Sequence, residues 1–135
     1  MSSNLKVVRL RDLLTLEHHG ALDLSSVVED VRQIASVPGA FSAFDVLVDT
    51  RGTELVLSTT DTWNAAAELA SAVHAGEPKG FNAKIAVLCP TDHFDNARFF
   101  ELCALNRGLN VRAFTAFEEV FDWLATHSPV TGPDT

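Results

Sequence analysis

The chain opens with a strand-like pattern. Residues 6–10 alternate between polar and apolar side chains, and residues 13–19 are also strand-like. Between them, Arg11 and Asp12 predict either a hairpin turn or a bend in one strand, and Gly20 is expected to end the run. One or two strands therefore precede the first helix.

A single apolar stripe marks that helix. Between residues 24 and 35, apolar side chains recur three and four positions apart. Either Asp23 or Ser26 caps its start, and Pro38-Gly39 ends it. This pattern predicts an amphipathic helix that covers one side of a sheet.

Three later segments predict buried strands. Residues 44–49, 84–89 and 111–114 are short and apolar on both faces, as the interior strands of a parallel sheet are. Thr50-Arg51-Gly52 is expected to break the first of them, and residues 53–60 fit either a short strand or an apolar loop.

Helical patterns follow each of these strands. Residues 61–75 are rich in alanine, with an inward face expected at Trp63, Ala66, Ala67, Ala70 and Val73. Residues 95–107 form the next helix, which Gly108 closes. The last helix is expected to begin at Thr115, in a capping box with Glu118.

The alternation of strands and helices predicts the α/β class. We expect a mostly parallel sheet of four to five strands, with an N-terminal hairpin or bent strand and about four flanking helices. Residues 1–127 form one domain, and residues 128–135 form a flexible tail.

Charge and composition limit the function. The 135 residues include 18 acidic and 10 basic side chains, a formal charge of −8, which opposes binding to nucleic acid or to anionic lipid surfaces. We expect no membrane span and no export signal, hence a cytoplasmic protein with Cys89 and Cys103 as reduced core thiols. Phosphate-loop and dinucleotide motifs are absent, so no cofactor is expected.

Several segments resemble the SpoIIAA-like family of small bacterial proteins over about residues 5–125. They are Leu47-Val48-Asp49-Thr50-Arg51, Lys84-Ile85-Ala86-Val87, Asn96-Ala97-Arg98-Phe99-Phe100-Glu101, Val111-Arg112-Ala113-Phe114 and Glu118-Glu119-Val120-Phe121-Asp122-Trp123-Leu124. The family is related to the STAS anti-sigma-factor antagonists and has been compared with CRAL-TRIO lipid-binding domains. The resemblance implies a sheet packed against helices and a regulatory or binding role.

STAS antagonists carry a phosphorylatable Ser or Thr before the second helix, commonly in an Asp-Ser-x-Gly motif. This chain has hydroxyls there, and Thr50, Ser58 and Thr60 are the candidate acceptors, but it lacks the motif. The alternative for the hydroxyls is ordinary capping of the helix.

Polar side chains follow the predicted strands at one edge of the sheet, where open α/β folds bind ligands. The candidate binding residues are Asp49, Thr50, Arg51, Asp92, His93 and Arg98. The alternative is that they fix a loop and cap a helix. His18 and His19 alternate in direction on a strand, so the pair cannot chelate one metal ion, and no metal site is expected.

The helix at residues 95–107 has more apolar side chains than one stripe needs. Phe99, Leu102 and Trp123 are therefore candidate interface residues, and we expect a homodimer. The same surface could instead bind a different protein partner.

Three functions follow. The first is a non-enzymatic regulatory or protein-interaction module. The second is a small-molecule or lipid-binding domain with an apolar cavity of around 300 Å³ or more, lined by residues such as Phe94, Phe99 and Trp63. The third is an enzyme that uses the carboxylates at the strand ends, but its sequence shows no pair of nucleophile and base beyond the weak hint of Cys89 and His93.

Overall fold

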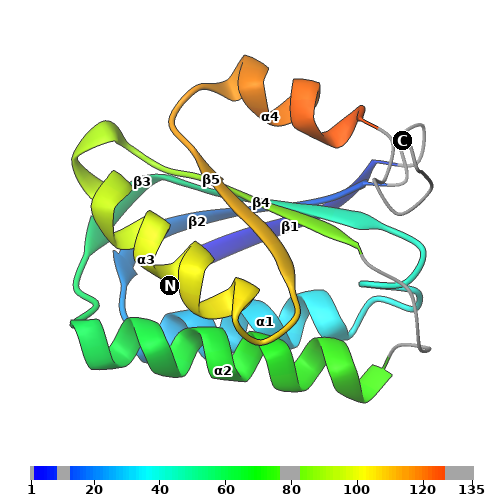
Figure 1. Cartoon of the computed structure of the whole chain (residues 1–135), viewed down its shortest axis with the longest axis horizontal. Helices are drawn as coiled ribbons and strands as arrows, with labels where there is room; N and C mark the ends of the chain where they lie inside the picture. The colour runs from blue at the N-terminus through cyan, green and yellow to red at the C-terminus, as the bar shows by residue number, and fades with distance from the viewer. Residues whose placement is uncertain (1, 9–12, 77–82, 127–135) are drawn as a thin grey trace.

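The computed structural model describes residues 2–8, 13–76 and 83–126 (Figure 1). Within these residues the order of elements is β1 (Ser2–Val8), β2 (Leu13–Leu22), α1 (Leu24–Ala35), β3 (Asp45–Leu55), α2 (Thr59–Gly76), β4 (Lys84–Leu88), the 3-10 helix η2 (Thr91–His93), α3 (Phe94–Leu105), β5 (Asn110–Phe114) and α4 (Phe117–Leu124). The tail expected at residues 128–135 and most of the loop between α2 and β4 lie outside them.

The described strands form one sheet in the order β1-β2-β3-β4-β5. The β1 and β2 strands are antiparallel, and β2 to β5 run parallel. The expected α/β fold class is confirmed, and the start of the chain is the hairpin rather than one bent strand.

Helices cover both faces of the sheet (Figure 1). Each parallel strand lies beside the one before it, and crossovers between parallel strands are right-handed, so α1, α2 and α3 fall on the same face. The α4 helix follows the edge strand β5 and packs on the opposite face.

The strands bury apolar side chains in two directions because successive residues point to opposite faces. Leu14, Leu16 and Val46 join the core beneath α1 to α3, whereas Leu13 and Leu47 join the core beneath α4. This double burial explains why the interior strands lack a polar face in the sequence.

The β2 and β3 strands are longer than the sequence predicted. Gly20, with φ +88°, does not end β2, and Thr50-Arg51-Gly52 does not break β3, so both expectations are wrong. After a bulge between Glu17 and His19, the two strands keep pairing as far as Leu22 and Leu55. Each strand supplies the hydrogen-bond partners that the other needs, and local turn signals are overridden.

Of the helix caps predicted at Asp23 or Ser26 and at Thr115, only the first is present in the structure. Asp23 caps α1: its Oδ1 accepts from Ser26 N at 2.9 Å, and Ser26 Oγ accepts from Asp23 N at 3.0 Å. The expected capping box of Thr115 and Glu118 is wrong, because α4 begins after Ala116 without a side-chain cap. At the other end of α4, Lys84 Nζ donates to the Trp123 carbonyl at 3.0 Å.

The buried face of α2 differs from the expected one at its first turn. Ala66, Ala70 and Val73 are buried as predicted, but Trp63 is 52% exposed. The helix turns Ala65 and Leu69 inward as well. Small side chains therefore line much of the side of α2 that faces the sheet.

Candidate functional site

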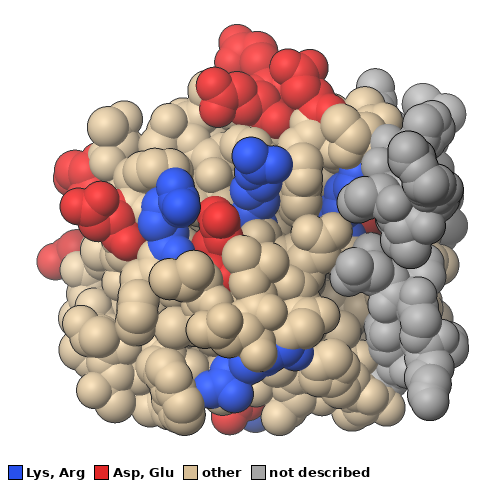
Figure 2. All heavy atoms as spheres, viewed as in Figure 1, with Lys and Arg blue, Asp and Glu red and all other residues tan. Residues whose placement is uncertain are grey.

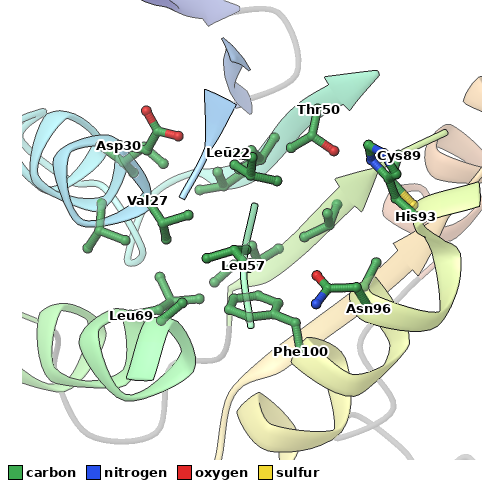
Figure 3. A pocket seen from close by; sticks show the side chains of 18 of the residues that line it. Leu22, Val27, Asp30, Thr50, Leu57, Leu69, Cys89, His93, Asn96 and Phe100 are labelled. Carbon is green, nitrogen blue, oxygen red and sulfur yellow. The ribbon is translucent and has the colours of Figure 1, made fainter. Parts of the chain in front are cut away.

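An apolar cavity of about 100 Å³ lies between the sheet and the three helices α1, α2 and α3 (Figure 3). Its lining is mainly aliphatic and aromatic and includes Val31, Val48, Leu57, Leu69, Val87 and Phe100. Seven helices and strands (β2, α1, β3, α2, β4, η2 and α3) contribute to this lining, so the cavity belongs to the tertiary packing rather than to any one motif.

Two valines at the centre of the sheet show that packing is incomplete here. Val48 and Val87 pair with each other across β3 and β4 and point toward the helices, yet both are only partly buried. By contrast, Val46 and Ile85 lie two residues earlier on the same strands and the same face, and they are only 1% and 3% exposed. Protein interiors normally leave no such space, so the core is packed less tightly over Val48 and Val87 than around Val46 and Ile85.

Two of the helix residues that line this cavity have small side chains. Ala65 on α2 and Ala97 on α3 both line the cavity and leave space above β3 and β4. Phe41 and Ile34 also line the cavity and are nearly fully buried. The cavity therefore extends toward the carboxyl ends of the parallel strands, where Leu22, Leu57 and His93 are only partly buried and where open α/β sheets bind ligands.

Most polar groups on the cavity wall already have partners. Thr50 Oγ1 donates to the Leu88 carbonyl at 3.1 Å, and Asn96 Nδ2 donates to Thr62 Oγ1 at 2.9 Å. His93 differs, because its buried Nδ1 has no hydrogen-bond partner among the described residues. Figure 3 shows Thr50, Cys89 and His93 close together at one end of the cavity.

The chemistry of Cys89 argues against a nucleophile at this end. Burial raises the pKa of the Cys89 thiol to about 11, and the nearby charge of Asp92 raises it further in the same direction. A catalytic cysteine needs the opposite shift, because the thiolate is the reactive form. Cys103 is a buried free thiol on α3.

Of the six candidate binding residues, only Thr50 and His93 line the cavity. Asp49 and Arg51 sit on the opposite face of β3, because neighbours on a strand point in opposite directions. They form a bidentate pair, with Arg51 Nε 3.0 Å from Asp49 Oδ1 and Arg51 Nη2 2.8 Å from Asp49 Oδ2.

The opposite charges of Asp49 and Arg51 neutralise each other. Burial raises the pKa of the Asp49 carboxyl, but the hydrogen bonds and charge of Arg51 outweigh burial and hold the pKa below its ordinary value. The guanidinium also lies 5.6 Å from the centre of the Phe117 ring at the start of α4. Asp49 and Arg51 are thus engaged in tying β3 to α4.

Arg98 and Asp92 lie in different places again. Arg98 is exposed on α3, with its guanidinium 5.9 Å from the Phe94 ring centre and its Nε 3.7 Å from Glu101 Oε1. It lines a separate surface groove between α3, β5 and α4. Asp92 is exposed in η2. The six residues therefore do not form one site.

The candidate phosphate acceptors also separate. Thr50 is buried, whereas Ser58 and Thr60 are exposed at the start of α2. Ser58 and Asp61 form a reciprocal cap there: Ser58 Oγ accepts from Asp61 N at 3.0 Å, and Asp61 Oδ2 accepts from Ser58 N at 3.1 Å.

The candidate interface residues differ in exposure. Leu102 is 55% exposed, whereas Phe99 and Trp123 are partly buried. Trp123 packs against Phe114, with ring centres 5.6 Å apart.

The cavity itself is lined by other residues than those expected. Phe94, Phe99 and Trp63 do not line it, whereas Val48 and Val87, which were not predicted, do. The only available signal was that both valines are small residues at the middle of buried strands.

The described part of the chain offers neither a metal site nor a membrane-spanning helix. It contains no group of three or more His, Cys, Asp or Glu side chains that could hold a metal ion. None of its helices combines the length and hydropathy that crossing a membrane requires.

Comparison with known proteins identifies the fold. No model of a known protein family matches the chain, and no curated protein matches its sequence. Among solved structures, it is similar to an uncharacterized protein of the DUF3478 family with a SpoIIAA-like fold from Shewanella loihica PV-4. The two share 18% sequence identity with a TM-score of 0.54, over 91% of this chain and 94% of the other. The chain therefore has a SpoIIAA-like fold, as the resemblance implied.

Proposed function

Starting from a SpoIIAA-like fold with a void beneath its central strands, we propose that this chain is a non-enzymatic regulatory domain that binds a small apolar ligand in the cavity. The observation that carries the proposal is the incomplete packing over Val48 and Val87. A void in a core costs stability, so a domain that keeps one gains a place where a ligand can restore the missing contacts.

The volume restricts the ligand. At about 100 Å³, the cavity is well below the roughly 300–1,000 Å³ of pockets that hold drug-sized molecules. It is nearer to an engineered apolar cavity of about 150 Å³ that binds benzene. The ligand is therefore a single ring or a short aliphatic chain, and the whole acyl chain of a lipid is too large.

The polar groups support binding rather than turnover. The Cys89 thiol is protonated at neutral pH, and Asp49 is neutralised by Arg51 on the far side of the sheet. Neither group is prepared for nucleophilic or acid–base chemistry.

Filling the cavity tests the proposal. The double variant Val48→Ile, Val87→Ile adds one methylene at each valine and keeps the β-branched shape that strands favour. We expect benzene to bind the natural chain, as measured by NMR chemical-shift changes of the cavity methyl groups, and to bind the double variant at least tenfold more weakly.

Val56→Ile is the matched control, because Val56 is 51% exposed and does not line the cavity. It should bind benzene as the natural chain does. Equal benzene affinity in the natural chain and the double variant, or no binding to the natural chain, would contradict the proposal.

A second function, a protein-interaction module that pairs with its own copy, is favoured by one surface. Leu102 and Trp63 are more than half exposed, and the Arg107 guanidinium lies 4.5 Å from the centre of the Trp63 ring. In Figure 2 most of the surface around α2 is uncharged, charged side chains of both signs lie near α3, and acidic residues gather on α4. Such a surface suits contact with another protein.

The oligomeric state tests this second function. We expect the natural chain to dimerise at micromolar concentration in analytical ultracentrifugation and Leu102→Glu to be monomeric. Glu118→Gln changes an exposed position of α4, on the opposite face of the sheet, and serves as the control. A natural chain that is monomeric at every concentration would exclude the homodimer.

A further inference from the structure

We propose that Phe41 is a movable wall of the cavity, and that a bound apolar ligand takes the place of its ring. This inference rests on the proposed ligand-binding function and specifies how the cavity admits its ligand. Phe41 lies in the loop between α1 and β3, lines the cavity and is only 3% exposed.

The size of the cavity requires one of its walls to move. The cavity holds about 100 Å³, whereas an engineered apolar cavity that binds benzene holds about 150 Å³. Side chains in a protein interior are closely packed, so a single ring fits only when a lining side chain gives up its place.

The backbone of Phe41 marks it as the side chain that yields. Its φ of +66° lies in the left-handed region, and in the described part of the chain only glycines share a positive φ with it. This conformation is strained for an aromatic residue, because Cβ crowds the following carbonyl oxygen. Such strain persists only where the surrounding structure enforces it, and it is concentrated at ligand clamps and switches.

Burial of the ring is what enforces the strain. Phe41 belongs to the same core cluster as Ile34 and Val46, so the loss of apolar contacts opposes any relaxation of the backbone. A ligand in the cavity supplies replacement contacts to that cluster, and the return of Phe41 to a negative φ then releases the strain. Ligand binding and relaxation of the loop therefore favour each other.

The loop can carry the ring out of the core while β3 stays paired. Ser42 N and Ala43 N donate to the Gly39 carbonyl at 3.0 and 2.6 Å, so these bonds join one loop residue to another. Pro38 and Ala43 are exposed, which places the loop at the surface. A change of φ from positive to negative redirects the Cα–Cβ bond of Phe41, and the ring turns toward solvent.

The experiment follows the backbone of Phe41 by NMR while benzene binds. The one-bond coupling between Cα and Hα differs between positive and negative φ. We expect saturating benzene to move this coupling in Phe41 from the positive to the negative range. Phe44 is the internal control, because it has no positive φ and does not line the cavity, and its coupling should stay in the negative range.

Phe41→Gly tests the same inference through affinity. Glycine adopts a positive φ without strain and has no ring, so the loop keeps its shape and the cavity is larger before the ligand arrives. We expect this variant to bind benzene about 3- to 10-fold more tightly than the natural chain, because no ring has to leave. Phe44→Gly removes a ring from the same loop but leaves the cavity lining unchanged, and should bind benzene as the natural chain does.

The outcomes separate this inference from the proposed function. Failure of benzene to bind the natural chain would overturn the proposed function itself. Binding to the natural chain with the Phe41 coupling still in the positive range would leave that function standing and overturn the role of Phe41. Equal or weaker binding of benzene by Phe41→Gly would overturn that role as well.

Discussion

His18 Nδ1 lies 2.6 Å from Asp30 Oδ2 and joins β2 to α1 inside the protein. The two residues are only 2% and 6% exposed. His18 Nε2 also lies 3.0 Å from the Ala21 carbonyl, so both ring nitrogens face oxygen atoms. His18 follows Leu14 and Leu16 on the same face of β2, and its polar pair with Asp30 closes the core beside the cavity.

Asp30→Ala should lower the free energy of unfolding by about 2–4 kcal/mol, because it leaves a buried imidazole facing a gap. Glu29→Ala, at the exposed neighbouring position, should cost less than about 0.5 kcal/mol. Urea denaturation measures both values. Equal losses in the two variants would show that the buried pair contributes little.

The Asp49–Arg51 pair predicts an acid-dependent part of the stability. The pKa of Asp49 is lower in the folded chain than its ordinary value of 3.8, so its contribution is complete above that value and disappears as the pH falls through the folded pKa. Asp49→Asn should be about 0.5–1 kcal/mol less stable at pH 7, and the difference should vanish in acid.

Thermal unfolding between pH 2 and pH 7 measures this dependence. Asp122→Asn, on the exposed side of α4, is the control and should follow the natural chain. A gap between Asp49→Asn and the natural chain that persists unchanged at pH 2 would refute the role of the pair.

Cys89 should be an unreactive thiol. With a pKa of about 11 against an ordinary 9.0, its thiolate fraction at pH 8 is about 100-fold smaller than that of a free cysteine. In a Cys103→Ala background, iodoacetamide should modify the folded chain at least 100-fold more slowly than the urea-unfolded chain. Asp92→Asn should speed the reaction, because it removes a negative charge that raises the pKa. Similar rates for the folded and unfolded chains would contradict this.

Glu101 protects the open edge of the sheet. β5 is an edge strand, and its Ala113 N–H donates to Glu101 Oε1 at 2.9 Å. Glu101→Ala should lower the free energy of unfolding by about 1 kcal/mol and increase self-association, because an edge with free donors pairs with other strands. Glu101→Gln keeps an acceptor oxygen, so its free energy of unfolding and its self-association should match those of the natural chain. Urea denaturation measures the free energy of unfolding, and light scattering measures the self-association. If Glu101→Gln and Glu101→Ala show the same losses, the effect comes from the charge of Glu101 and not from its hydrogen bond.

The architecture could be predicted because its signals are local. Segments such as residues 44–49 and 84–89 carry apolar side chains on both faces, which is typical of a strand that is covered on both sides. A single apolar stripe likewise marked α1, and Asp23 with Ser26 marked its start. Each signal depends on neighbours within a few residues, and the order of the signals sets the parallel sheet.

The site could be predicted only in part. Thr50 and His93 were expected at the carboxyl edge and do line the cavity, but Asp49 and Arg51 were expected beside them. Once β3 continued to Leu55, alternation along the strand sent Asp49 and Arg51 to the other face. That continuation depends on pairing with β2, more than thirty residues away in the chain.

The sequence by itself therefore determined the class of fold and the order of its elements. Tertiary structure alone decided where β2 and β3 end, which polar atoms find partners and where the core stays empty. Hydrophobic periodicity depends only on residues that are close together in the sequence. The cavity, by contrast, depends on the distances between residues of four different elements, such as Val48, Val87, Ala65 and Ala97. No short segment of the sequence determines those distances.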